Sequence, residues 1–403
     1  MLTMGGAAVG VNQVLSQCLP PRREVAPLKV GIVGTGARGR WLAKVAGFIP
    51  EIQITAVCDL LETNAKACQE AVGKPIKIYS DYKKLLEDRD VQAILIAVPL
   101  FLHYEVAKAG LMAGKHVYCE KTLTHTITEA VTLRKLATSS NHILQVGYQH
   151  RFNPVYQEIK FLIDQGYCGK ILAVECTWNR NGNWRRDLPA GVAFKGNSIY
   201  PSLEHLINWR MYKRYSAGLT GELCSHQIDM LHWLLGGHPE YFIGVGSIDY
   251  WKDGRETYDN VHFTAVYPDG LKASFTSLTF NALQGYSLKI LGDKGSIEVN
   301  GDDGHRAKIY SEQVEENKAV DSITEATKLA WENREGIPVR VKNPATDDML
   351  PTENALRHFA ECVAAGKKPD SNIDTAIISS IAVCLANEAI EQRRVVYWRE
   401  AEN

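Results

Sequence analysis

A hydrophobic strand runs into a glycine-rich turn in the stretch Leu28-Lys29-Val30-Gly31-Ile32-Val33-Gly34-Thr35-Gly36-Ala37-Arg38-Gly39. In such a turn the first glycine permits a tight bend, the second lets the backbone approach a pyrophosphate, and the third packs the helix onto the strand. The helix that follows begins near Trp41, and its N-terminus would face the anion. We therefore expect a dinucleotide to contact Gly34, Gly36, Ala37, Arg38 and Gly39.

An acidic residue follows the next predicted strand at the spacing that such a turn requires. Asp59 comes 20 residues after Gly39, where a carboxylate would accept hydrogen bonds from the hydroxyls of the adenosine ribose. The same carboxylate would repel a 2′-phosphate, which favours NAD over NADP. Arg38 has two interpretations: it meets that phosphate, or it lies over the pyrophosphate or adenine, and we favour the second.

Residues 27–150 alternate short β-branched runs with helical patterns. This alternation is typical of parallel βαβ units and predicts a Rossmann-type α/β domain. The expected strands are Leu28–Val33, Gln53–Cys58, Ala93–Val98, His116–Glu120 and His142–Tyr148.

The chain changes character after Arg151. One strand, Ile171–Trp178, is followed by about forty irregular residues, and loops of this length usually bind ligands. A helical pattern over Leu219–Leu235 comes next. Alternating strands then predict an α+β domain over residues 151–350, built on an open, mainly antiparallel sheet: Phe242–Tyr250, Val261–Tyr267, Leu271–Thr279, Tyr286–Leu291 and Ser296–Val299.

The exposed face of that sheet is expected to pair with another subunit, which predicts a homo-oligomer. Residues 351–403 carry two helical patterns, Ala355–Ala365 and Thr375–Glu391, that we expect to pack back against the first domain.

Length and composition agree with a two-domain, soluble protein. The chain has 403 residues, more than one hydrophobic core usually serves. Its net charge of −1 provides no broad basic field, which argues against nucleic acid and favours a small neutral partner. The nine cysteines are odd in number and form no C-x-x-C pair, so we interpret them as buried, reduced thiols.

Residues 1–26 have two interpretations. The apolar run from Met4 to Val11 resembles a twin-arginine signal without its arginines, which would send the protein to the periplasm. The alternative is a disordered tail on a cytoplasmic protein. The run from Met4 to Val11 is too short to span a bilayer. We expect no other segment of the sequence to come near transmembrane length.

Further candidate residues follow two other strands of the first domain. Ligands of open α/β sheets bind at the carboxyl edge, which places Pro99, Leu102, Glu120 and Lys121 near the nicotinamide. A Lys–Glu pair on a surface loop is usually a weak solvated ion pair. At the crevice, however, Lys121 would polarise or protonate a substrate oxygen while hydride leaves the neighbouring carbon.

At these residues the sequence resembles the glucose–fructose oxidoreductase, inositol dehydrogenase and MocA family. The family's E-K-P motif appears here as Glu120-Lys121-Thr122, with a threonine in place of the proline that fixes the loop. The segment from Val146 to Pro154 also looks like the family's crossing between domains. By this resemblance, His103 and Gln149 would line the cofactor site.

The helical pattern after the loop places Glu222, His226 and Asp229 on one stripe at i, i+4 and i+7. A metal site and a helix-packing histidine are both conceivable, although no fourth ligand suggests itself and we expect no metal. The resemblance implies that His226 is the general base and that Lys121 holds the substrate oxygen. Glu222 stands where the family has aspartate and would orient the imidazole or bind substrate, whereas Asp229 would be structural.

The irregular loop mixes aromatic rings with planar hydrogen-bond donors. Sugars stack on such rings and bond to such donors, but subunit interfaces have a similar composition. The candidate substrate-binding residues are Lys121, Arg151, Trp184, Arg185, Trp209, Arg210 and His226.

Together these features predict an NAD-dependent oxidoreductase that moves hydride between nicotinamide and a carbinol carbon of a sugar, glycoside or polyol. One alternative is an NAD-recycling glycosidase or lyase, which would oxidise its sugar only transiently. The lysine at position 121 favours dehydrogenation. The other alternative is a non-catalytic dinucleotide-binding sensor.

Overall fold

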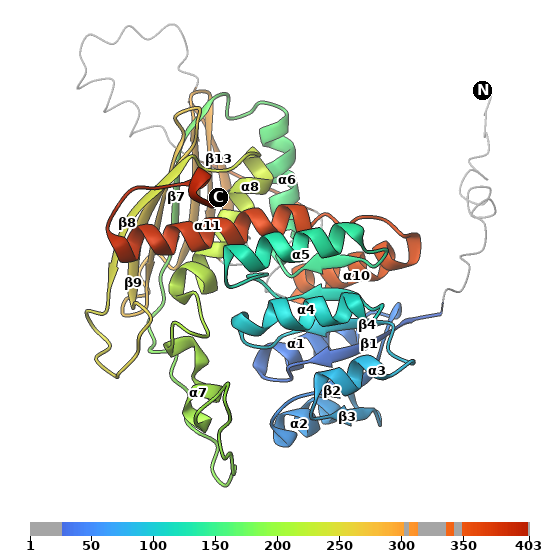
Figure 1. Cartoon of the computed structure of the whole chain (residues 1–403). Coiled ribbons are helices and arrows are strands. Elements are labelled where there is room, and N and C mark those ends of the chain that lie inside the picture. The colour runs from blue at the N-terminus through green and yellow to red at the C-terminus, as the bar shows by residue number, and fades with distance from the viewer. Residues whose placement is uncertain (1–25, 302–305, 313–335, 342–348, 402–403) are drawn as a thin grey trace, which may run out of the picture.

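The computed structural model describes residues 26–301, 306–312, 336–341 and 349–401, and it contains two sheets with helices around them (Figure 1). One sheet is six-stranded and parallel, and the other is nine-stranded and mainly antiparallel. The expected fold class is therefore confirmed. The predicted leader or tail lies outside the described residues, apart from its last residue.

The parallel sheet positions the glycine turn. Its strand order is β3-β2-β1-β4-β5-β6, and helices α1 to α5 connect consecutive strands. The strands are β1 Leu28–Val33, β2 Ile52–Cys58, β3 Lys77–Tyr79, β4 Ala93–Ile96, β5 His116–Cys119 and β6 Leu144–Val146. The helices are α1 Ala37–Ala46, α2 Glu62–Val72, α3 Tyr82–Glu87, α4 His103–Met112 and α5 Ile127–Ser139.

Local sequence explains most of these elements. All four residues of β4 are buried, as expected for a strand covered by helices on both faces. A capping box between Thr126 and Glu129 starts α5, and the Asp81 side chain caps α3. The sequence did not predict β3, because this strand is only three residues long and its residues Lys77 and Ile78 are exposed.

The second sheet has the order β14-β13-β12-β11-β7-β10-β9-β8-β15. β7 Ile171–Trp178 pairs in parallel with β10 Lys272–Leu278, so the sheet is mixed rather than uniformly antiparallel. The remaining strands are β8 Tyr241–Ser247, β9 Asn260–Val266, β11 Tyr286–Gly292, β12 Gly295–Asn300, β13 Arg306–Ser311, β14 Ile337–Pro338 and β15 Val396–Tyr397.

The helix before β8 is not regular from its beginning. A π turn, Thr220–Cys224, precedes α8 Ser225–Leu235, where a continuous helix from Leu219 was expected. The irregular loop contains the short helix α7 Leu203–Ile207 and a 3₁₀ turn, Trp209–Met211. In Figure 1 the segment with α7 extends alongside the parallel sheet domain.

The C-terminal helices contact both sheets' domains. α10 Met349–Ala365 packs on α1, and its Phe359 meets the ring of Tyr118 of β5 edge to face. α11 Ile373–Gln392 contacts α5 on one side and α8 and β8 on the other. These contacts join the two domains.

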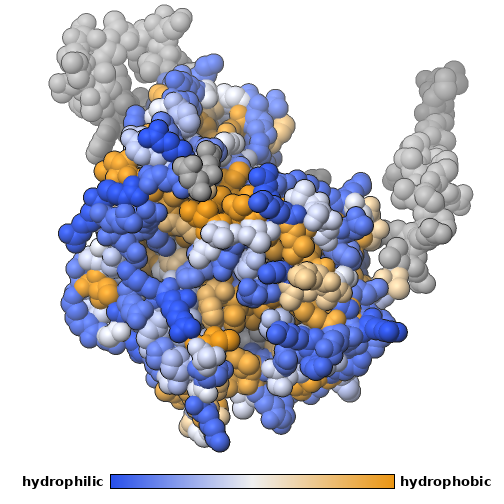
Figure 2. Space-filling view, viewed as in Figure 1, coloured by the Kyte–Doolittle hydropathy of each residue, from blue (hydrophilic) through white to orange (hydrophobic). Residues whose placement is uncertain are grey.

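α11 corrects the expectation that no further segment approaches transmembrane length. Its 20 residues and mean hydropathy of 1.5 are sufficient by length and composition, but 67% of its most apolar window is buried within the protein. Core helices of globular proteins show the same pattern. On the face that includes α11, α5 and α4, hydrophobic and hydrophilic side chains are interspersed (Figure 2).

Candidate active site

A cavity of about 1050 Å³ lies at the carboxyl edge of the parallel sheet. Its walls come from the glycine turn, the ends of β2, β4 and β5, the irregular loop and the helix that carries His226. This volume is at the upper end of the roughly 300–1,000 Å³ typical of small-molecule sites. The cavity therefore has room for more than one small ligand.

The glycine turn has the shape that a dinucleotide needs. Gly34 has φ +86°, and a Cβ there would lie 2.7 Å from the backbone of Ala97 and Val98. A Cβ on Gly39 would collide with the carbonyl oxygen of Gly34, whereas Gly36 faces open space. No side chain caps α1 at Gly36, so its first N–H groups are available to an anion. These observations fit a bound pyrophosphate.

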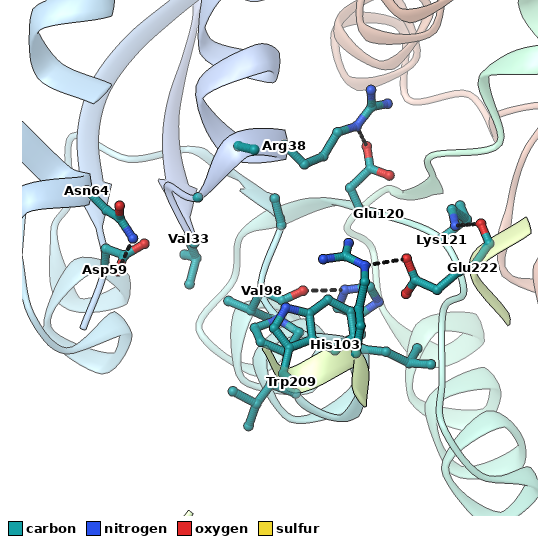
Figure 3. Close-up of a pocket in the computed structure, with 18 of the residues that line it drawn as sticks. Val33, Arg38, Asp59, Asn64, Val98, His103, Glu120, Lys121, Trp209 and Glu222 are labelled. Atoms are coloured by element: carbon teal, nitrogen blue, oxygen red, sulfur yellow. Dashed lines mark hydrogen bonds and ion pairs between the residues drawn. The ribbon is translucent and has the colours of Figure 1, made fainter. Parts of the chain in front are cut away.

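Asp59 lies directly beside this turn, at the end of β2 (Figure 3). Its Oδ2 accepts hydrogen bonds from the Thr35 amide at 2.7 Å and the Thr35 hydroxyl at 3.0 Å. Its Oδ1 accepts one from the Leu61 amide at 2.9 Å. The carboxylate is thus held in place at the cavity wall, where ribose hydroxyls would bind.

Arg38 points away from Asp59. Its Nε donates to Oε1 of Glu120 at 2.8 Å, at the end of β5 (Figure 3). Arg40 lies nearer to the ribose position: its Nη1 is 3.1 Å from the carbonyl oxygen of Thr35 and 3.5 Å from Oδ1 of Asn64. Arg38, one candidate ligand for the 2′-phosphate of NADP, is therefore directed toward the predicted nicotinamide end of the cavity.

His103 forms hydrogen bonds with the loop that carries Lys121. Its Nδ1 lies 2.7 Å from the carbonyl oxygen of Thr122, and its Nε2 lies 2.9 Å from that of Val98. Burial lowers the pKa of His103, so its neutral ring donates to one carbonyl at a time. Pro99, Leu102 and Gln149 also line the cavity.

Lys121 contacts the π turn of the second domain. Its Nζ donates to the carbonyl oxygen of Glu222 at 2.7 Å and to that of Gly221 at 3.4 Å. The hydroxyl of Thr122, which follows Lys121 through a cis peptide bond, also donates to Gly221, at 3.2 Å. π turns offer carbonyls in geometries that a regular α-helix lacks and are frequent at functional sites.

Burial lowers the pKa of Lys121, although Glu222 and Glu120 oppose this effect. The ammonium group lies in the cavity wall and is held by carbonyl oxygens. It can therefore present its remaining N–H to a substrate oxygen.

Within the described residues, the side-chain hydrogen bond of Glu222 goes to Arg210 rather than to the imidazole of His226. Its Oε2 accepts a hydrogen bond from Nε of Arg210 at 2.7 Å. Burial would raise the pKa of Glu222, but Arg210 and Lys121 together hold it below its ordinary value. The expectation that Glu222 shares a stripe with His226 assumed α-helical spacing, and the intervening π turn breaks that spacing.

His226 lies deep in the cavity and is only 6% exposed. Its ring packs against His150 at 4.9 Å and Trp178 at 5.4 Å between ring centroids. Burial, then Lys121 and His150, hold the pKa of His226 well below its ordinary value. Its Nδ1 has no hydrogen-bond partner within the described part of the chain. The imidazole is thus neutral, and one of its two ring nitrogens carries a lone pair that can accept a proton.

Three predicted substrate residues do not line the cavity. Arg151 makes two 2.7 Å hydrogen bonds to Asp229, and these side chains are 2% and 1% exposed. Arg185 pairs with Glu204 of the same loop and with Asp253 of the connection between β8 and β9, and Trp184 packs against the hydrophobic core. Carboxylates contributed by distant segments thus bind the two arginines. The structural role expected for Asp229 agrees with this contact.

Trp209 and Arg210 do line the cavity, with the Arg210 guanidinium 4.2 Å above the Trp209 ring. Sequence reasoning missed several other lining residues: Asn64, His150, Trp178, Arg180, Arg186 and Tyr200. Arg180 and Arg186 lie in the irregular loop described above, and Trp178 is the last residue of the strand before it. Among the described residues, no group of three or more His, Cys, Asp or Glu side chains is arranged to hold a metal ion.

Comparison with known proteins identifies the family. The model of the GFO/IDH/MocA oxidoreductase family, with an NAD-binding Rossmann fold, matches residues 28–148. The GFO/IDH/MocA C-terminal domain matches residues 156–298. The chain therefore belongs to this family, and the resemblance that its sequence suggested is confirmed.

Individual relatives cover different shares of the chain. An uncharacterized oxidoreductase from Synechocystis is 24% identical over 92% of this chain and 95% of its own length. Inositol 2-dehydrogenase from Salmonella typhimurium is 30% identical over 52% of this chain, and the match spans only 54% of that enzyme. The structure of levoglucosan dehydrogenase with NADH aligns with a TM-score of 0.73 at 20% identity, over 92% of this chain and 99% of that one.

Proposed function

We propose that this protein is an NAD-dependent dehydrogenase that oxidises a carbinol group of a sugar, glycoside or polyol. One observation carries the proposal: Lys121 and the neutral imidazole of His226 line the same cavity as the glycine turn and Asp59. A hydrogen-bond donor and a proton acceptor thus lie in one site with a dinucleotide-binding turn. Relatives named for inositol and levoglucosan support the substrate class.

The cofactor fits the residues present. Gly34, Gly36 and the N-terminus of α1 would hold the pyrophosphate, and Asp59 would hold the ribose. NAD, when bound, supplies the hydride acceptor for the carbinol carbon. NAD is preferred to NADP in this proposal because the Asp59 carboxylate would repel a 2′-phosphate while Arg38 is tied to Glu120.

The protein's own residues would manage the hydroxyl group. Lys121 donates a hydrogen bond to the substrate oxygen and fixes its position. His226 accepts the hydroxyl proton as the carbinol becomes a carbonyl. Its depressed pKa keeps it unprotonated before the reaction and makes the resulting imidazolium a ready proton donor in the reverse direction. Trp178 and His150 exclude water from one side of the ring.

A carbohydrate panel tests the proposal. The purified chain is incubated with NAD and each of a series of neutral and acidic sugars and polyols, while NADH and product are both measured. A dehydrogenase yields NADH and oxidised sugar in equal amounts. Release of an aglycone without net NADH would instead indicate the glycosidase alternative. A sensor would bind NADH but consume no sugar.

The same proposal includes a homo-oligomer built on the open face of the second sheet. On β8, Ile243 and Val245 are 48% and 57% exposed, side by side with Thr264 and His262 of β9. Exposed apolar side chains that gather on one face of a sheet are typical of subunit contacts. Val245→Glu should convert an oligomer to monomers in light scattering, while a solution monomer of the unaltered chain would refute this part.

A further inference from the structure

The buried side-chain amide of Asn208 joins two segments of the irregular loop at the cavity. The Asn208 side chain, 2% exposed, accepts a hydrogen bond from the Arg186 amide at 2.7 Å and donates one to the Arg186 carbonyl oxygen at 3.0 Å. It also donates to Oε2 of Glu204 at 2.8 Å. Residue 186 is therefore fixed beside the turn that contains Trp209 and Arg210.

This arrangement brings two guanidinium groups to the same wall of the cavity. Arg186 and Arg210 both line it. Asn208, two residues before Arg210, holds the backbone of Arg186, and burial and then the positive charge of Arg210 lower the pKa of Arg186. Two adjacent cations repel each other and are stable together only when an anion or water screens them.

The carboxylates nearby do not balance these charges. Within the described residues, the Arg186 side chain makes no hydrogen bond or ion pair, and Arg210 uses only Nε, toward Glu222. Lys121 adds a third cation, which is held by backbone carbonyls rather than by a carboxylate. Glu120 is already paired with Arg38. The catalytic end of the cavity is thus positive, although the whole chain has a net charge of −1.

We propose that Arg186 and Arg210 form a subsite for an anionic group on the substrate, a carboxylate or a phosphate attached to the sugar. The planar guanidinium fork matches both groups through paired hydrogen bonds. The subsite lies next to the catalytic lysine, because Arg210 binds the side chain of Glu222 while Lys121 binds the backbone of the same residue. A sugar acid or sugar phosphate would thus be held with its ring between the arginines and Lys121.

This inference rests on the proposed function for the identity of the ligand, and it replaces the small neutral partner expected from net charge. The diphosphate of the cofactor is another source of the same anionic chemistry. We favour the substrate, because Asn208 fixes Arg186 beside the turn that contains Arg210, and Arg210 binds the side chain of Glu222, whose backbone holds Lys121.

Calorimetric titration of the full chain saturated with NADH tests the subsite. Uronates and sugar phosphates are compared with their neutral parent sugars, in the unaltered chain and in Arg186→Gln. We expect at least one acidic sugar to bind about 10-fold tighter than its parent, and Arg186→Gln to remove that difference. Arg214→Gln, at an exposed arginine of the same loop, serves as the matched control.

Three results would overturn the subsite: no acidic sugar binds, neutral parents bind as tightly as the acids, or Arg186→Gln weakens NADH binding instead. The last result would assign Arg186 to the cofactor diphosphate. Binding is measured without turnover, so the subsite and the proposed function fail separately. An acidic sugar that binds through Arg186 but never reduces NAD would refute the dehydrogenase and leave the subsite intact.

Discussion

The Nζ of Lys121 lies 2.7 Å from the carbonyl oxygen of Glu222. Lys121 follows the last residue of β5 by two positions, whereas Glu222 belongs to the π turn before α8, so this hydrogen bond crosses between the two domains. The lysine is held by backbone and needs no partner carboxylate. The Glu222 side chain is consequently available to bind Arg210 at the substrate end of the cavity.

Lys121→Met should abolish most of the turnover while the affinity for NADH stays close to that of the unaltered protein. Positioned proton donors and acceptors typically contribute about 10²–10⁴-fold to rate, and we expect a loss in that range. Steady-state kinetics with fluorescence titration of NADH measure both quantities. Lys66→Met, at an exposed lysine of α2, is the control. Equal losses in turnover and cofactor affinity would contradict the assigned role.

The pH profile of kcat/KM should be broad on its acid side. His226 must be unprotonated to accept a proton, and its pKa lies well below 6.5, so activity should persist at pH 6.5 and fall only at lower pH. Lys121 must be protonated to donate, and its pKa lies below 10.5, so activity should fall as the pH rises toward that value. His226→Gln should remove the acid limb. An acid limb that survives this substitution belongs to another group.

Asp59→Ala should weaken NAD binding about 10- to 100-fold, as expected for loss of hydrogen bonds to a charged group. The ratio of NADP to NAD affinity should rise, because the repulsion of the 2′-phosphate disappears. Titration of both cofactors measures the change, with the surface variant Asp90→Asn as control. An unchanged ratio would show that Arg40 or another residue sets cofactor preference.

Asp229→Ala should destabilise the protein by about 3–5 kcal/mol, because it leaves the buried Arg151 guanidinium without its carboxylate. Denaturant unfolding measures the change in the free energy of unfolding. Asp164→Ala removes an exposed i,i+4 partner of Lys160 and should change that free energy by less than about 1 kcal/mol. A stable Asp229→Ala variant with selectively impaired sugar binding would contradict this account and would indicate that Arg151 binds the substrate.

The features that the sequence predicted well are local. Strand, turn and helix follow one another within Leu28–Ala46, and the close contact between Gly39 and Gly34 acts over a few residues. Alternating apolar residues likewise located β8 to β12 within two or three residues at each end. Lys121 and His226, which both line the cavity, each lie in a short recognisable motif.

The errors arose from contacts between distant residues and from one irregular turn. Arg151 and Asp229 are 78 residues apart, so their ion pair is invisible to a local pattern, and Arg151 was taken for a substrate ligand. The π turn at Thr220–Cys224 has no distinct sequence signal, and it separated Glu222 from the imidazole that it was expected to orient. Arg186 gained its significance only through the hydrogen bonds of Asn208.

The central claim is that hydride leaves a carbinol carbon in the cavity that contains Lys121 and His226, and isotope transfer tests it most directly. A sugar from the panel that supports NADH formation is deuterated at its carbinol carbon and incubated with NAD and the protein, and the reduced cofactor is analysed by mass spectrometry. The account predicts a reduced cofactor carrying the deuterium, formed by the unaltered chain and lost in His226→Gln. An unlabelled reduced cofactor, or consumption of the sugar with no net reduced cofactor, would contradict it.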